Sequence, residues 1–152
     1  MRIICDTREK IPWTFTSNKI ESVEVKKLDT GDYSLENFED LFCIERKKST
    51  SELFKNIIEK RFEKEMIRMS ELSYKFLILE FTFEDVLNYP RGSGIPPKKW
   101  RYTKIHPNFV IKKLAEYSVQ HGISIIYAGN TANAIQIATS LMKEVFTKHG
   151  FD

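Results

Sequence analysis

The apolar run Phe76-Leu77-Ile78-Leu79 constrains the fold of this chain more than any other segment. A short apolar run without alternating polar residues predicts a strand that is buried on both of its faces. Residues 54–69, which precede it, carry apolar side chains three or four positions apart, a pattern typical of a helix with one apolar face. A buried strand that follows such a helix indicates an α/β sandwich.

Local signals predict the other elements. The pattern Ser49-x-x-Glu52 is a capping box, so we expect one long helix that runs from this point to about Leu72. Pro107 suits the first turn of a later helix, and Gly122 should end it. The expected strands cover residues 2–6, 23–28, 33–35, 41–47, 76–79 and 123–127, the expected helices residues 49–72, 83–89, 107–120 and 131 onward, and an irregular loop residues 91–103.

Length and composition limit the classes of protein to consider. A chain of 152 residues has the size of one domain, and its 41% hydrophobic content is enough for a core. No apolar run approaches the roughly 18 residues that a membrane span needs, so we expect no membrane partner. The N-terminal sequence MRIICDTREK has no apolar signal-peptide core, so we expect a cytoplasmic protein in which Cys5 and Cys43 are buried thiols.

Charge is unevenly distributed along the chain. The formal net charge is only +3, but residues 91–113 contain seven Lys or Arg residues and no acid, which leaves −4 for the remainder. Cations that alternate with aromatic rings can neutralise phosphates and stack on unpaired bases. The alternative is a solvated loop in which the tryptophan packs on the core. The candidate DNA-binding residues of this basic segment are Lys98, Lys99, Trp100, Arg101, Tyr102 and Lys104.

The sequence Glu45-Arg46-Lys47 is the strongest candidate for chemistry. Residues two apart on a strand share a face, so Glu45 and Lys47 should project together. A hairpin of residues 33–35 with 41–47 would bring Asp32 beside them. Two carboxylates suit Mg²⁺ or Mn²⁺, and a nearby lysine suits phosphodiester hydrolysis. The alternative is ordinary alternating charge on a solvated strand.

The spacing of the histidines and cysteines argues against a zinc site and against serine or cysteine hydrolases.

Three motifs in order, Asp6-Thr7-Arg8-Glu9, Gly31-Asp32-Tyr33 and Glu45-Arg46-Lys47, resemble the ERCC4-type nuclease domain of the XPF/Mus81 family. The likeness continues through Arg61, Glu80 and the helix that begins at Thr131-Ala132, so it covers nearly all of residues 1–152. It implies the fold of restriction endonucleases, a mixed β-sheet flanked by α-helices in a single domain.

The resemblance also implies roles for individual residues. Asp32 and Glu45 would be metal ligands for Mg²⁺ or Mn²⁺, and Asp6 would add a third carboxylate. Lys47 would be the catalytic lysine. Arg46 also matches a family position, and it is assigned to the catalytic group as an anchor of the DNA backbone; the alternative is an ion pair with Glu9 or Glu45.

Three other positions have two interpretations each. The family carries an aspartate after its E-R-K motif, and strict spacing puts Ser51 at that position. A one-residue insertion would put Glu52 there instead. Glu52 would then be a catalytic residue, or it is only the capping partner of Ser49. Arg8 matches a family position and is assigned to DNA, with a salt bridge to Glu9 as the alternative. Arg61 would reach a phosphate or pair with Glu65.

The function that the resemblance implies is metal-dependent DNA endonuclease activity on flapped, branched or single-stranded regions. The alternative is a catalytically inactive module on the same scaffold that binds DNA or a partner. Family members usually carry a helix-hairpin-helix pair after the nuclease domain, and this sequence shows none. A homodimer through the nuclease domain, dependence on a partner, and a minimal stand-alone enzyme from a phage or prokaryote therefore all remain open.

Overall fold

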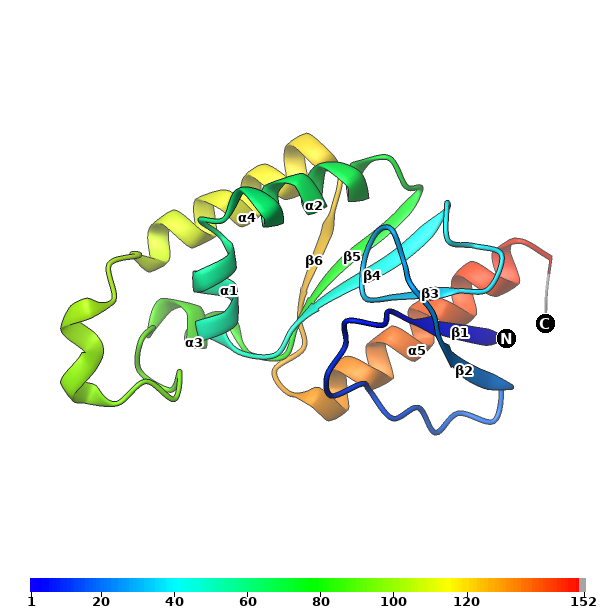
Figure 1. Cartoon of the computed structure of the whole chain (residues 1–152), viewed down its shortest axis with the longest axis horizontal. Helices are drawn as coiled ribbons and strands as arrows, with labels where there is room; N and C mark the ends of the chain where they lie inside the picture. The colour runs from blue at the N-terminus through cyan, green and yellow to red at the C-terminus, as the bar shows by residue number, and fades with distance from the viewer. Residues whose placement is uncertain (151–152) are drawn as a thin grey trace.

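Six strands form one mixed sheet in the order β2-β1-β3-β4-β5-β6 in the computed structural model, which describes residues 1–150 (Figure 1). β3 is antiparallel to both of its neighbours, whereas the other pairs are parallel. The expected hairpin is therefore confirmed as the pair β3 and β4. The strands are β1 (Arg2–Cys5), β2 (Ser22–Val25), β3 (Tyr33–Leu35), β4 (Phe42–Lys47), β5 (Tyr74–Leu79) and β6 (Ser124–Tyr127).

Helices cover both faces of the sheet. Figure 1 shows α1, α2 and α4 on one face and α5 along the other. This arrangement confirms a single α/β domain with a mixed sheet. The helices are α1 (Thr50–Asn56), α2 (Lys60–Ser70), α3 (Phe83–Leu87), α4 (Pro107–His121) and α5 (Thr131–Lys148), with a 3-10 helix, η1 (Pro97–Tyr102), between α3 and α4.

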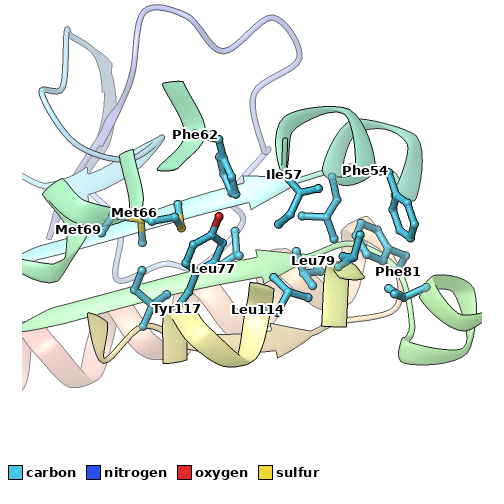
Figure 2. Close-up of a cluster of buried hydrophobic side chains, with 14 of the residues drawn as sticks. Phe54, Ile57, Phe62, Met66, Met69, Leu77, Leu79, Phe81, Leu114 and Tyr117 are labelled. Carbon is cyan, nitrogen blue, oxygen red and sulfur yellow. The ribbon is translucent and has the colours of Figure 1, made fainter. Parts of the chain in front are cut away.

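The apolar run in β5 contributes to two cores. Leu77 and Leu79 pack with side chains of α1, α2 and α4, as Figure 2 shows, whereas Ile78 packs on the α5 side. All three residues are fully buried. The sequence prediction of a strand buried on both faces is therefore confirmed, and its cause is that successive side chains of a strand point to opposite faces.

The expectation of one long helix over residues 49–72 is wrong, because the chain forms two helices there. α1 ends at Asn56, and α2 begins after Glu59, whose backbone is extended (φ −88°, ψ 133°). Ile58 lies at the break and is 59% exposed, although its place in the apolar pattern had predicted burial. Spacing of three and four residues is satisfied equally by one helix and by two successive helices that face the same core.

The start of that helix is confirmed at Ser49. Its hydroxyl oxygen accepts a hydrogen bond from the amide of Glu52 over 3.2 Å. The Glu52 carboxylate lies 3.7 Å from the Lys47 ammonium, on β4. Glu52, in the first turn of α1, thus directs its carboxylate toward Lys47 on the sheet.

The cysteines and the helices were the subject of two further expectations. Cys5 and Cys43 are free and buried, as expected. Within residues 1–150, no helix combines the length and the hydrophobicity needed to cross a bilayer.

Candidate active site

The turn Gly31-Asp32 is fixed from three sides. Gly31 has a φ of +81°, and a Cβ there would lie 2.8 Å from the Cβ of Cys43, so only glycine fits. Its amide donates to Glu65 on α2 over 2.7 Å. The amide of Asp32 donates to the Ile44 carbonyl, and the Asp32 carbonyl accepts from the amide of Asp6, each over 2.8 Å. Strands β1 and β4 and helix α2 therefore all position Asp32.

The carboxyl groups of Asp32 and Glu45 are close neighbours at this point. Asp32 Oδ2 also accepts from the Arg46 amide over 2.9 Å. Burial raises the pKa of Asp32 well above its ordinary value, and the charge of Glu45 raises it further. Burial also raises the pKa of Glu45, against the lowering effect of Lys47. Burial, which disfavours the charged form, is the largest cause of both shifts, and the charge of Glu65 raises the pKa of Glu45 further.

Lys47 completes a group of polar side chains beside this pair. Its Nζ donates to Asn56 Oδ1 over 2.7 Å and lies 3.4 Å from Glu45 Oε2. Glu52 Oε1 is 3.7 Å away, and the ring of Phe62 lies under the ammonium at 4.8 Å. The lysine is thus held by both β4 and α1, with only 9% of its side chain exposed.

These groups open into a cleft of about 460 Å³ between the end of β4 and helices α1 and α2. The structure brings six of the residues singled out in the sequence to its walls: Arg8, Asp32, Glu45, Lys47, Glu52 and Arg61. Five other residues complete the lining: Lys10, Asn56, Phe62, Glu65 and Arg68.

Asp6 does not line this cleft. Its Oδ1 accepts from the amide of Leu28 over 2.8 Å, and its Oδ2 accepts from Nε of Arg8 over 2.6 Å. The pKa of Asp6 is lowered in spite of its burial, because these donors stabilise the carboxylate. Asp6 therefore supports the loop after β2 and the side chain of Arg8, and its place as a third metal ligand has no geometric support.

Arg46 points away from the cleft, as strand alternation requires. Its Nε donates to Glu80 over 2.7 Å, and one terminal nitrogen donates to Glu9 over 2.8 Å. The guanidinium also lies over the Trp13 ring at 4.8 Å. These carboxylates raise the pKa of Arg46 despite its burial. The ion pair with Glu9, which was the alternative interpretation, is present. Arg46 could contact DNA only if its buried side chain rotated out to the surface.

Arg8 and Arg61 do reach the cleft. The Arg8 side chain is 66% exposed while its Nε is held by Asp6, so a salt bridge exists with Asp6 and not with Glu9. The Arg61 side chain is 82% exposed and pairs with Glu59 over 3.0 Å, whereas Glu65 pairs with Arg68. Both guanidiniums remain accessible to an anionic ligand.

The basic segment lies apart from the cleft walls. Residues 97–102 form η1, where an irregular loop was expected, at the far end of the molecule beyond α3 (Figure 1). Its cationic side chains, Lys98, Lys99, Arg101 and also Lys104, are exposed. Trp100 is partly buried, and its ring nitrogen donates to the Ile95 carbonyl over 2.8 Å, so it stabilises its own loop.

Ser51 connects this loop to α1. Its hydroxyl donates to the Ser93 carbonyl over 3.0 Å, and it does not line the cleft. Of the two candidates for the family's aspartate, Glu52 is therefore the one that the structure places beside Lys47.

Two cleft residues escaped the sequence analysis. Asn56 belongs to no motif, and its relation to Lys47 arises only because α1 ends beside β4. Glu65 was considered only as a partner for Arg61, yet it accepts from Gly31 and Arg68. Its position in the apolar stripe, next to Met66, was the available signal that it faces inward.

The donor set of this cleft fits Mg²⁺ or Mn²⁺. Within residues 1–150 there is no cage of three or more His, Cys, Asp or Glu residues, but Asp32 and Glu45 present two adjacent carboxyl groups. Mg²⁺ is commonly held by one or two carboxylates together with substrate phosphates and water. The pKa values of Asp32 and Glu45 are raised chiefly because burial disfavours their charged forms, and a divalent cation would stabilise those forms.

Comparisons with known proteins agree with this fold. The chain has the fold of XPF from Aeropyrum pernix, with a TM-score of 0.68, 19% identity, and coverage of 95% of this chain and 65% of that one. XPF from Aeropyrum pernix in complex with DNA gives a TM-score of 0.67, 20% identity, and coverage of 99% and 68%. The ERCC4 domain model matches residues 5–141, so the chain belongs to the ERCC4 domain family, a family of DNA nucleases. No curated protein matches the sequence significantly.

The chain spans 65% of the length of the first of these structures. At about 20% identity, this likeness shows the fold.

Proposed function

We propose that this chain is a metal-dependent DNA endonuclease that hydrolyses phosphodiester bonds near flapped, branched or single-stranded regions. One observation carries the proposal: Asp32, Glu45 and Lys47 meet in an open cleft, with Lys47 Nζ 3.4 Å from Glu45 Oε2. Paired carboxylates beside a fixed ammonium suit the hydrolysis of a phosphodiester. Membership of the ERCC4 family supports the same class of substrate.

Asp32 and Glu45 are the residues that would hold Mg²⁺ or Mn²⁺. When bound there, such a cation supplies Lewis-acid polarisation of the phosphodiester. The protein contributes the fixed position of the two carboxyl groups, since the Asp32 side chain is tied to the Arg46 amide and Glu45 lies on the central strand β4.

Lys47 orients the attacking water and offsets negative charge that builds on the phosphate. Asn56 holds the ammonium at 2.7 Å, and Glu52 stands on its other side at 3.7 Å. Because both partners belong to α1, that helix sets the direction in which the remaining N–H groups of Lys47 point.

The exposed cations around the cleft would bind the DNA backbone. Arg8 and Arg61 lie at its walls, and the basic segment with Lys98, Lys99, Trp100, Arg101, Tyr102 and Lys104 would bind DNA farther from the cleaved bond. The structural neighbour in complex with DNA supports DNA as the partner. A homodimer and an intracellular location remain part of this proposal.

The decisive experiment is cleavage of end-labelled duplex, flap and junction DNA with Mg²⁺ or Mn²⁺. We expect Lys47→Ala to reduce the rate by about 100-fold or more, by analogy with the loss of one transition-state donor. The matched control is Lys48→Ala, whose side chain is absent from the cleft walls, and it should keep the rate of the original chain.

A separate measurement tests the metal site without catalysis. Mn²⁺ should raise the midpoint of thermal unfolding of the original chain and have little effect on Asp32→Asn. Failure of both metals to support cleavage, or full activity of Lys47→Ala, would contradict the endonuclease proposal. Tight DNA binding without metal and without any product would assign the chain to the inactive DNA-binding class.

A further inference from the structure

A second hollow, of about 580 Å³, adjoins the cleft that holds Asp32 and Glu45. Arg8 and Arg68 line both spaces, so the cleft and the second hollow adjoin at these two side chains and are together named the groove. Figure 1 shows that the loop from β2 to β3 rises on the same side of the sheet as α2. The other walls of the second hollow come from the segment after β1 and from this loop: Thr7, Lys27, Leu28 and Asp29.

The two parts of the groove differ in charge. The cleft has four carboxyl-bearing and five cationic side chains among its walls, and two of the carboxyl groups form the candidate metal pair. The second hollow has three cationic side chains and a single acid, Asp29. A hollow with this balance repels a metal ion and attracts a phosphate group, and arginine forms planar paired hydrogen bonds with phosphate oxygens.

Buried carboxylates hold both arginines in place. Asp6 accepts from Nε of Arg8 over 2.6 Å, and Glu65 accepts from Arg68. The same carboxylates also fix the loop before β3, because Asp6 accepts from the amide of Leu28 over 2.8 Å and Glu65 from that of Gly31 over 2.7 Å. The loop that carries Lys27 and the two guanidiniums is thus organised before any ligand binds.

The arginines are nevertheless accessible. The side chain of Arg8 is 66% exposed and that of Arg68 is 45% exposed. Each guanidinium carries five N–H donors, and the carboxylate contact of each uses only part of that set. Lys27, which also lines the second hollow, is exposed. All three cations can therefore reach a ligand in the groove.

We propose that Arg8, Arg68 and Lys27 form a phosphate-binding subsite for the DNA strand next to the bond that is cleaved. The strand leaves the cleft between the two arginines and passes over the loop after β2. This inference rests on the proposed function for the identity of the ligand, but it adds two residues, Lys27 and Arg68, and a direction for the strand.

The test compares two adjacent lysines. Lys26 and Lys27 are both exposed and carry the same charge, but only Lys27 lines the hollow. Binding of a fluorescent single-stranded oligonucleotide is measured by anisotropy, without metal, over a series of salt concentrations. We expect Lys27→Ala to weaken binding roughly fivefold and to lower the salt slope by about 0.7, the value for one phosphate contact to a single strand. Lys26→Ala should match the original chain.

Two results would overturn the subsite: equal binding by Lys27→Ala and the original chain, or equal weakening by both lysine substitutions, which would indicate only a general charge effect. The result is independent of cleavage. If the original chain cuts no DNA but Lys27→Ala alone loses affinity, the endonuclease proposal fails and the subsite stands. If the chain cuts DNA and the two lysine variants are equivalent, the subsite fails and the endonuclease proposal stands.

Discussion

The amide oxygen of Asn56 accepts a hydrogen bond from the ammonium of Lys47 over 2.7 Å. Asn56 is the last residue of α1, and Lys47 is the last residue of β4. This contact between the end of α1 and the end of β4 fixes the side chain of Lys47 in the cleft wall. We therefore expect Asn56 to position Lys47 for the proposed chemistry.

Asn56→Ala should reduce the cleavage rate about tenfold and leave DNA affinity nearly unchanged, because it removes a fixed orientation of Lys47 and no phosphate contact. Single-turnover cleavage and anisotropy titrations measure the two effects. Asn56→Gln, which keeps an amide on a longer side chain, should recover part of the rate. An unchanged rate for Asn56→Ala would show that Lys47 is held adequately by its carboxylate neighbours.

Arg46→Ala should destabilise the protein by about 3–5 kcal/mol, the typical cost of leaving a buried charge without its partner. Glu80 would be that uncompensated charge, since its side chain is only 2% exposed and pairs with Arg46 over 2.7 Å. Urea unfolding followed by circular dichroism measures the change. Arg61→Ala is the control, and it should shift stability by less than about 0.5 kcal/mol because Arg61 is on the surface. Similar stability losses in both variants would contradict this assignment.

Asp32→Asn should stabilise the metal-free protein at neutral pH. The pKa of Asp32 is raised in the folded state, so the folded protein binds its proton more tightly than the unfolded chain does. That contribution to stability is complete below the unfolded pKa of about 4 and is lost as the pH rises through the folded value.

The stabilising effect of Asp32→Asn should therefore be largest at pH 7 and should disappear toward pH 4. Thermal unfolding in the presence of a chelator, recorded over this pH range, measures it. Ser34→Ala, a buried polar change outside the cleft, gives the pH dependence of an uncharged substitution. A gain for Asp32→Asn that does not vary with pH would show that electrostatic strain at Asp32 is not its cause.

Gly31→Ala should destabilise the fold by more than about 1 kcal/mol and also impair metal binding. The new Cβ would lie 2.8 Å from the Cβ of Cys43, at a residue whose φ is +81°. Gly92→Ala is a matched control, because its φ is +75° but nothing lies within 4 Å of the added carbon. Thermal unfolding compares the two variants. If both lose the same stability, backbone conformation alone accounts for the effect, without the contact to Cys43.

The strands were the part of the fold most open to prediction from sequence. The apolar run at 76–79 indicates both strand and burial, whereas alternation at Val23 and Val25 indicates only the strand, since both side chains are exposed. The period of two correctly separates Glu45 and Lys47 from Arg46. The two-helix form of residues 50–70 was beyond reach, since both arrangements bury the same stripe.

Sequence by itself determined which residue types stand where strands end: the turn at Gly31-Asp32, the alternation around Arg46, and the family to which their order belongs. Only the tertiary structure decided how each charge is used. In the folded chain, Asp6 accepts a hydrogen bond from the amide of Leu28, and Arg46 donates one to Glu80. Asn56 accepts one from Lys47. The reason is physical: a side chain's role depends on which donors and carboxylates lie within about 3 Å of it, and most of those come from distant parts of the chain.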